Sequence, residues 1–197
     1  MKERRRDQGT RIMSRISIEP ANRSDEAELR AMQVASFRIL GRSFYDDDVI
    51  EGFIADIGTM DDNLLLDGSY FKAVANGRIL GSGGWSWRTP AYASHVADIA
   101  PGPHVAQATV RSIFVHPEHA GRGIGRELMA AIEQKIAAAG FGTASLMATL
   151  CGIPFYRRLG YRNGRPVALR LPNAQTFVGM EMEKLLVVTT VEQDKAA

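Results

Sequence analysis

Cysteine is almost absent from this chain of 197 residues, which contains only Cys151. An intramolecular disulfide is therefore excluded, and such cysteine usage is typical of a reducing compartment. Long hydrophobic runs are absent too, since no stretch of about 18 apolar residues occurs, and no transmembrane helix is predicted. No apolar segment of the secretory type follows the basic first residues. We therefore expect a cytoplasmic protein without a membrane partner.

A large excess of charge is also missing, because the formal net charge is only +2. Residues 1–11 hold five basic and two acidic side chains, so the remaining 186 residues carry a net charge of −1. A nucleic-acid-binding domain needs a basic patch on its folded body, and we therefore expect no nucleic-acid partner. We interpret residues 1–13 as a disordered basic tail, residues 14–187 as one domain and residues 188–197 as a C-terminal tail.

Hydrophobic periodicity and turn residues predict a mixed α/β (α+β) domain. Asn76-Gly77 between two strand-like runs is a strong hairpin signal. Ser24 is the expected N-cap of the first helix. The acidic run 46–48 lacks the spacing of a calcium loop and predicts a helix N-terminus rather than a metal site. The predicted strands are 15–19, 70–75, 78–86, 109–115, 143–149, 167–171 and 176–186, and the predicted helices begin near residues 24, 46, 124 and 154.

The clearest candidate site is the glycine-rich segment Gly121–Gly125, which joins a predicted strand to a predicted helix. Glycine allows a close approach of the backbone, and the first turn of a helix offers free N–H groups to an anion. Arg122 and Arg126 add positive charge. A P-loop would need Lys-Ser or Lys-Thr after the last glycine, and a dinucleotide-binding turn would need a different glycine spacing. We interpret the segment as a phosphate or pyrophosphate site, with a ligand-free helix start as the alternative.

Two further features are candidates for acceptor binding. Trp85 and Trp87 alternate along one predicted strand and share a face, so they either pack in the core or line a substrate pocket. Residues 88–107, which include Tyr92, form a long irregular stretch, and such stretches in compact domains are usually functional or mobile. We expect an acceptor loop there.

Two motifs follow each other in a characteristic order. Val115 and Pro117 precede Gly123-Ile124-Gly125 and an amphipathic helix, and after a further strand comes Phe-Tyr-Arg-Arg-Leu-Gly-Tyr at 155–161. This arrangement resembles the GNAT superfamily of N-acetyltransferases. The resemblance is specific over residues 110–161 and elsewhere rests on element order.

The resemblance implies a GNAT-like fold, with a central, mixed, mostly antiparallel sheet of six to seven strands and about four helices. Two adjacent parallel strands, 109–115 and 143–149, would splay apart. Two departures from the family pattern are Ala120, where Gln or Arg is usual, and Thr149, where Asn is frequent.

The resemblance also implies acetyl-CoA as co-substrate and no metal. The pantetheine arm would insert between the splayed strands, and the glycine-rich segment would hold the pyrophosphate. The implied cofactor-binding residues are Ile113, Phe114, Val115, Gly121, Arg122, Gly123, Ile124, Gly125, Arg126, Phe155 and Arg158.

The implied reaction is direct transfer of the acetyl group to an amine within a ternary complex. Tyr156 matches the family's tyrosine that protonates the leaving thiolate, whereas a purely structural tyrosine is the alternative. Strand 108–115 contains no acidic residue, so His104, Asp98 and ordered water are the leading candidates for the general base. A non-catalytic CoA-binding sensor on the same fold is the alternative function.

The sequence does not distinguish between a small-molecule amine and a peptide amine as the acceptor. Trp85, Trp87 and Tyr92 hint at an apolar or aromatic acceptor. The last strand has an apolar face that could mediate a homodimer. We interpret Cys151 as a buried, inert thiol, since no sequence feature provides the basic partner that a nucleophilic cysteine needs.

Overall fold

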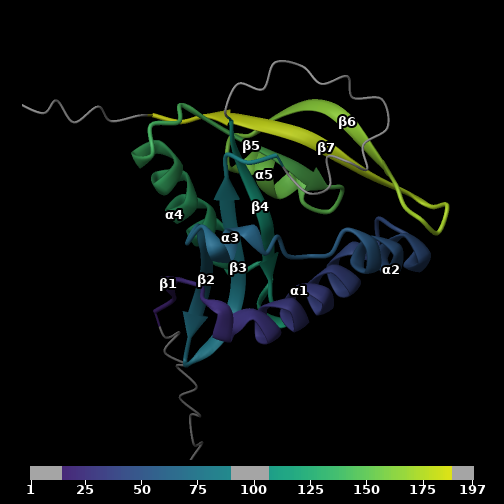
Figure 1. Cartoon of the computed structure of the whole chain (residues 1–197), viewed down its shortest axis with the longest axis horizontal. Helices are drawn as coiled ribbons and strands as arrows, with labels where there is room; N and C mark the ends of the chain where they lie inside the picture. The colour runs from purple at the N-terminus through teal and green to yellow at the C-terminus, as the bar shows by residue number, and fades with distance from the viewer. Residues whose placement is uncertain (1–14, 90–106, 188–197) are drawn as a thin grey trace, which may run out of the picture.

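A computed structural model describes residues 15–89 and 107–187. Its strands are β1 (Ser17–Pro20), β2 (Tyr70–Ala75), β3 (Arg78–Ser86), β4 (Ala108–Val115), β5 (Thr143–Thr149), β6 (Arg162–Arg170) and β7 (Thr176–Leu185). They form one seven-stranded sheet in the order β1-β2-β3-β4-β5-β7-β6 (Figure 1). Neighbouring strands are antiparallel except β4 and β5, which are parallel. The expected mixed, mostly antiparallel sheet is confirmed.

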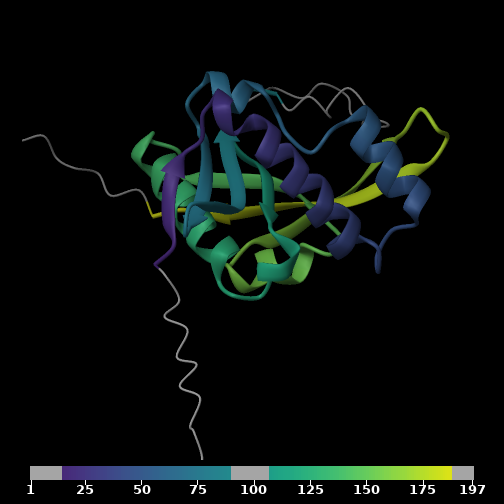
Figure 2. The same ribbon diagram turned by 90° about the horizontal axis from the view of Figure 1, so that it is seen from below.

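Helices cover both faces of this sheet. They are α1 (Glu26–Gly41), α2 (Asp47–Asp56), α3 (Asn63–Leu66), α4 (Ile124–Ala138) and α5 (Ile153–Arg158), with 3-10 turns η1 (Arg23–Asp25) and η3 (Pro117–His119). Helices α1 and α2 lie on one side of the sheet, and α4 and α5 lie on the other (Figure 2). Within the two described ranges, no helix is both long enough and apolar enough to cross a membrane.

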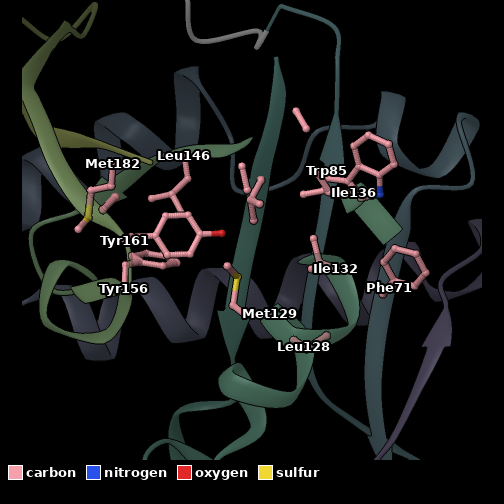
Figure 3. Close-up of a cluster of buried hydrophobic side chains, with 14 of the residues drawn as sticks. Phe71, Trp85, Leu128, Met129, Ile132, Ile136, Leu146, Tyr156, Tyr161 and Met182 are labelled. Carbon is pink, nitrogen blue, oxygen red and sulfur yellow. The ribbon is translucent and has the colours of Figure 1, made fainter. Parts of the chain in front are cut away.

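The two faces of the sheet bury separate cores. On one face, α4 contributes Leu128 and Ile132, both fully buried, as part of the cluster drawn in Figure 3. On the other face, Phe37 of α1 and Phe53 of α2 pack against Phe177 of β7, with Phe53 and Phe177 ring centroids 4.4 Å apart. The sheet is therefore a shared wall between two layers of helices.

The start of the first helix differs from the expectation. Asn22, not Ser24, is the capping residue: its side chain accepts from the Ser24 N–H at 2.9 Å. The Asp25 carboxylate accepts in turn from the Asn22 N–H at 2.9 Å, which completes a capping box. The turn η1 then leads into α1, whose N-cap is Asp25 without a side-chain cap hydrogen bond, so the prediction of Ser24 as the N-cap was wrong.

The last two strands also correct the prediction. Strand β6 begins at Arg162, earlier than the predicted start at residue 167. The prediction missed residues 162–166 because they are all exposed and show no alternation of buried and exposed positions. Strand β7 lies between β5 and β6, and Met182 on its apolar face is buried in the core. The two edge strands of the sheet are therefore β1 and β6. The basic tail, the C-terminal tail and most of the expected acceptor loop lie outside the described residues.

Candidate active site

The site begins where β4 and β5 separate. The two strands pair only at Ala108–Ala144 and Thr109–Ser145, although both continue for several residues in the described structure. A bulge in β4 accompanies the separation, since Ser112 has a φ of 54° and the register with β3 shifts at this point. Backbone groups of both strands thus face a gap instead of each other, and the expected splay is confirmed.

A buried polar network supports the bulge from the α1 side. Tyr70 donates its hydroxyl to Ser82 Oγ at 3.1 Å, and Gln33 donates to the same Oγ at 3.0 Å. Gln33 also donates to the Tyr70 hydroxyl. Ser82 Oγ lies 3.5 Å from the carbonyl oxygen of Ser112 itself. Because Gln33, Tyr70 and Ser82 are all fully buried, they fix the backbone at the bulge.

A cleft of about 990 Å³ opens at this separation. One end, which we call the donor end, is formed by the β4 terminus, the glycine-rich segment, the start of α4 and α5. The other, the acceptor end, is formed by α1, α2 and the loop that follows α2. The volume is that of a typical small-molecule site.

The glycine-rich segment supplies a helix N-terminus to the donor end. Gly123 is the N-cap of α4 with a φ of 89°, and no side chain caps this helix. Nothing lies within 4 Å of a Cβ built on Gly121 or Gly123, so the left-handed backbone is what requires glycine there. Gly125 differs, because its Cβ would come 3.1 Å from the Phe155 ring. The first N–H groups of α4 remain available to an anion.

Positive charge accompanies these N–H groups. Arg126 and Arg158 both line the cleft, both are exposed, and neither forms an ion pair with another described residue. Arg122 is exposed but does not line the cleft. The donor end therefore combines a helix N-terminus with two unpaired guanidinium groups, which is chemistry suited to a phosphate or pyrophosphate.

Tyr156, on α5, lines the donor end of the cleft. It is 8% exposed and packs with its ring centroid 5.8 Å from that of Tyr161 (Figure 3). Burial raises the pKa of Tyr156 far above its usual value, and the nearby Cys151 acts in the same direction. The phenol therefore stays protonated at neutral pH, which is the form that a proton donor needs, although burial also makes it a weaker acid.

Cys151 lines the same wall. Its Sγ lies 3.1 Å from Thr149 Oγ1. Burial raises the pKa of the Cys151 thiol, and the Thr149 contact only partly opposes this. The protonated thiol is a poor nucleophile, which supports the interpretation of an inert cysteine.

The acceptor end carries one ion pair in an apolar wall. Arg111 Nη1 donates to Asp61 Oδ2 at 2.5 Å, with the two side chains 5% and 11% exposed. Arg111 also donates to the carbonyl oxygen of Arg88. The apolar wall consists of Phe37, Leu40, Phe44, Phe53, Ile57 and Met60.

The cleft gathers most of the residues expected to bind the donor. Of that set only Arg122 is missing from its wall, and the Arg122 side chain is exposed to solvent instead. Trp85 and Trp87 are also missing. Trp85 packs in the core with its ring centroid 5.7 Å from that of Phe141 (Figure 3), while Trp87 is 50% exposed. These tryptophans do not form the expected pocket wall.

Several expected residues cannot be placed, and others carry no signal in the sequence. Tyr92, Asp98 and His104 lie outside the described residues. The sequence does not single out Asp61 or the wall from α1 and α2, since no local pattern marks residues that meet only in the folded chain. Arg111 does carry a signal, because it is a charged residue inside a strand of otherwise uncharged residues.

Comparisons with known proteins agree with this architecture. The family model of the GNAT acetyltransferase domain matches residues 67–163. A GCN5-related N-acetyltransferase from Rhodopseudomonas palustris superposes with a TM-score of 0.67 at 21% identity, covering 90% of this chain and 100% of that one. The PaiA N-acetyltransferase of Thermoplasma acidophilum, solved with coenzyme A, gives a TM-score of 0.61 at 17% identity over 87% and 99%. No curated protein sequence matches significantly.

A third structure is a GNAT family acetyltransferase from Brucella melitensis in complex with acetyl-CoA. It gives a TM-score of 0.51 at 22% identity, covering 75% of this chain and 83% of that one. The fold and the family model agree on an acetyltransferase domain of the GNAT type. The chain belongs to the GNAT superfamily.

Proposed function

We propose that this protein transfers an acetyl group from acetyl-CoA to an amine by direct attack in a ternary complex. The observation that carries the proposal is the separation of β4 from β5 beside an uncapped helix N-terminus with two unpaired arginines. Two of the similar structures contain CoA or acetyl-CoA, which supports the same donor.

Each part of the donor end has a role in this proposal. The backbone of Ile113 and Val115 hydrogen-bonds the pantetheine arm as a neighbouring strand would. The N–H groups at Gly123–Gly125, together with Arg126, hold the pyrophosphate, and Arg158 contacts the nucleotide end. Phe114 and Phe155 complete the walls.

The chemistry needs two protons removed from the amine nitrogen, one before and one after its attack, and one proton delivered to the thiolate. An alkyl ammonium with a pKa of about 10.4 costs roughly 4.6 kcal/mol to deprotonate at pH 7. The neutral amine attacks the thioester carbonyl, an N–C bond forms, and a backbone N–H in 113–115 stabilises the oxyanion. The C–S bond then breaks, and Tyr156 gives its proton to the leaving thiolate. The attacking nitrogen loses its second proton, which passes through water and restores the Tyr156 phenol. Asp98, His104 or ordered water takes the ammonium proton.

A thermal-shift titration with acetyl-CoA, CoA and NADH tests the donor. A ligand at 100 times its Kd stabilises the native state by about 2.7 kcal/mol, which raises the Tm by several degrees. We expect this shift with both CoA species and none with NADH. No shift with either CoA species would contradict the proposal.

An acceptor-dependent release of CoA then separates the enzyme from a sensor. Binding of acetyl-CoA without release, for any amine, would favour the non-catalytic CoA-binding module. A cytoplasmic location, the lack of a nucleic-acid partner and a homodimer stay predictions.

A further inference from the structure

The acceptor end is apolar and partly open to solvent. Leu40 and Phe44 line the cleft while remaining 38% and 50% exposed, which is unusual for large apolar side chains within a concave wall. Burial of such surface by a bound molecule is favourable in proportion to the apolar area covered. The wall is therefore suited to an apolar body.

Among the described residues, the charged side chains at this end are Asp61 and its ion-pair partner Arg111. Among the described residues that line the cleft, the acids are Asp61 and Glu133. Glu133 lies on α4 and accepts from Lys184 Nζ at 2.6 Å. Of the acids in the described residues, Asp61 is therefore the one at the acceptor end, and the candidate base Asp98 lies outside those residues.

The Asp61 carboxylate is held in a fixed position. Its Oδ2 accepts from Arg111 at 2.5 Å, and its Oδ1 accepts from the Asn63 N–H at 3.1 Å. Arg111 immediately precedes the bulged Ser112, so the carboxylate is anchored to β4 where that strand leaves β5. The charge of Asp61 is balanced by Arg111, but a carboxylate has lone pairs beyond those used here, so an amine that approaches the thioester in this gap passes beside a fixed hydrogen-bond acceptor.

We propose that the natural acceptor is an amine on an apolar body that carries no second positive charge. Its ammonium group binds the Asp61 carboxylate before deprotonation, and its body packs on the wall of Leu40 and Phe44. The inference rests on the proposed acetyl transfer and names the acceptor class for that site. A second ammonium group would lie against apolar side chains and lose its hydration without a partner.

A matched pair of acceptors tests the class. Hexylamine and hexane-1,6-diamine differ by one ammonium group, and 2-phenylethylamine and spermidine extend the comparison. We expect kcat/KM, measured by CoA release at saturating acetyl-CoA, to be at least tenfold higher for hexylamine than for the diamine. Equal or higher values for the diamine or spermidine would overturn the inference.

Variants of Leu40 and Phe44 test whether the apolar wall binds the acceptor. Leu40→Ala and Phe44→Ala should each raise the KM for hexylamine several-fold and leave the KM for acetyl-CoA unchanged. Leu66→Ala is the matched control, because Leu66 is 63% exposed and does not line the cleft. A hexylamine KM that is unchanged in Leu40→Ala and Phe44→Ala would overturn the inference.

The carboxylate has its own matched control. Asp67 accepts from Arg88 Nε at 3.0 Å, is 13% exposed at its side chain and does not line the cleft. We expect Asp61→Asn, but not Asp67→Asn, to raise the hexylamine KM at least tenfold while acetyl-CoA still shifts the Tm. An unchanged KM in Asp61→Asn would overturn the role of Asp61.

The two proposals fail in different ways. If acetyl-CoA gives no thermal shift, the proposed function itself is contradicted. If acetyl-CoA binds and only polycationic amines are acetylated, acetyl transfer stands and the inferred acceptor class falls. If acetyl-CoA binds and none of the four amines is acetylated, the inferred class is likewise overturned.

Discussion

The donor end and the acceptor end of the cleft are built from different material. The donor end uses backbone groups from a nearly continuous stretch, 113–126, with α5 beside it. The acceptor end uses side chains from α1, α2, the loop after α2 and β4, and its ion pair joins residues 50 positions apart. A site formed by backbone groups keeps its binding groups when a side chain changes, as with Ala120 in place of a polar residue. A site formed by side chains loses or gains binding groups with each substitution, so its ligand specificity changes more easily.

The largest effect is expected at Tyr156, on the α5 wall of the donor end. Tyr156→Phe removes the proposed proton donor and keeps the buried ring, so kcat should fall about a hundredfold, within the usual range for general acid catalysis. The thermal shift caused by CoA should remain, because the phenol has no role in holding the donor. A variant with unchanged kcat would exclude Tyr156 as the acid.

A smaller effect should separate two neighbouring arginines. Arg126→Ala should weaken CoA binding roughly tenfold, since a charge-assisted hydrogen bond contributes about 1.5 kcal/mol or more. Arg122→Ala should weaken it less, because Arg122 does not line the cleft. Calorimetric titration of both variants checks the order, and the acceptor KM should stay the same in each. An equal loss for both would mean that the whole turn, rather than the cleft wall, binds the phosphates.

The smallest effect lies away from both ends, at Asp25. Burial alone would raise the pKa of Asp25, but hydrogen bonds from Lys72 and Asn22 and the charge of Lys72 outweigh it, so the pKa lies below its ordinary 3.8. The ionised form is thus favoured in the folded state, and its contribution is present above pH 3.8 and lost as the pH falls through the lowered pKa.

Asp25→Asn should therefore lower the free energy of unfolding at pH 7 by about 1 kcal/mol. Urea unfolding at neutral pH and at a pH of about 2.5 measures the change, and the difference between wild type and variant should shrink at the lower pH. CoA binding should not change. A difference that grows toward acidic pH would contradict the sign of the shift.

Local signals account for the parts of the fold and of the site that the sequence predicts. The Asn76-Gly77 turn determines the β2–β3 hairpin residue by residue, because both central residues have positive φ and few residue types tolerate it. The same holds for the turn at Gly123, whose glycine and flanking elements are adjacent in sequence. The donor end is therefore predictable from the sequence alone, apart from the position of Arg122 outside the cleft wall.

Tertiary contacts account for what the sequence does not predict. Asp61 is a candidate for the site because Arg111 holds its carboxylate in the cleft wall. The two residues are 50 positions apart in the sequence, and no motif links them. The alternation of residues along a strand predicts that Trp85 and Trp87 share a face of the sheet. It does not predict whether that face packs against a helix or lines a cleft, so on the sequence alone Trp85 is a candidate for both. The exposed start of β6 carries no alternation and is held instead by its pairing with β7.

The contact between Gly125 and Phe155 limits how this enzyme could be redesigned. A Cβ at position 125 would meet the Phe155 ring, and Phe155 is the neighbour of Tyr156 on the short helix α5. The glycine-rich turn and Tyr156, the proposed proton donor, thus lie on two parts of the fold that are in close contact. Under the proposed function, a larger residue at position 125 would displace α5 and with it Tyr156, so we expect a change of donor to be harder to build here than a change of acceptor.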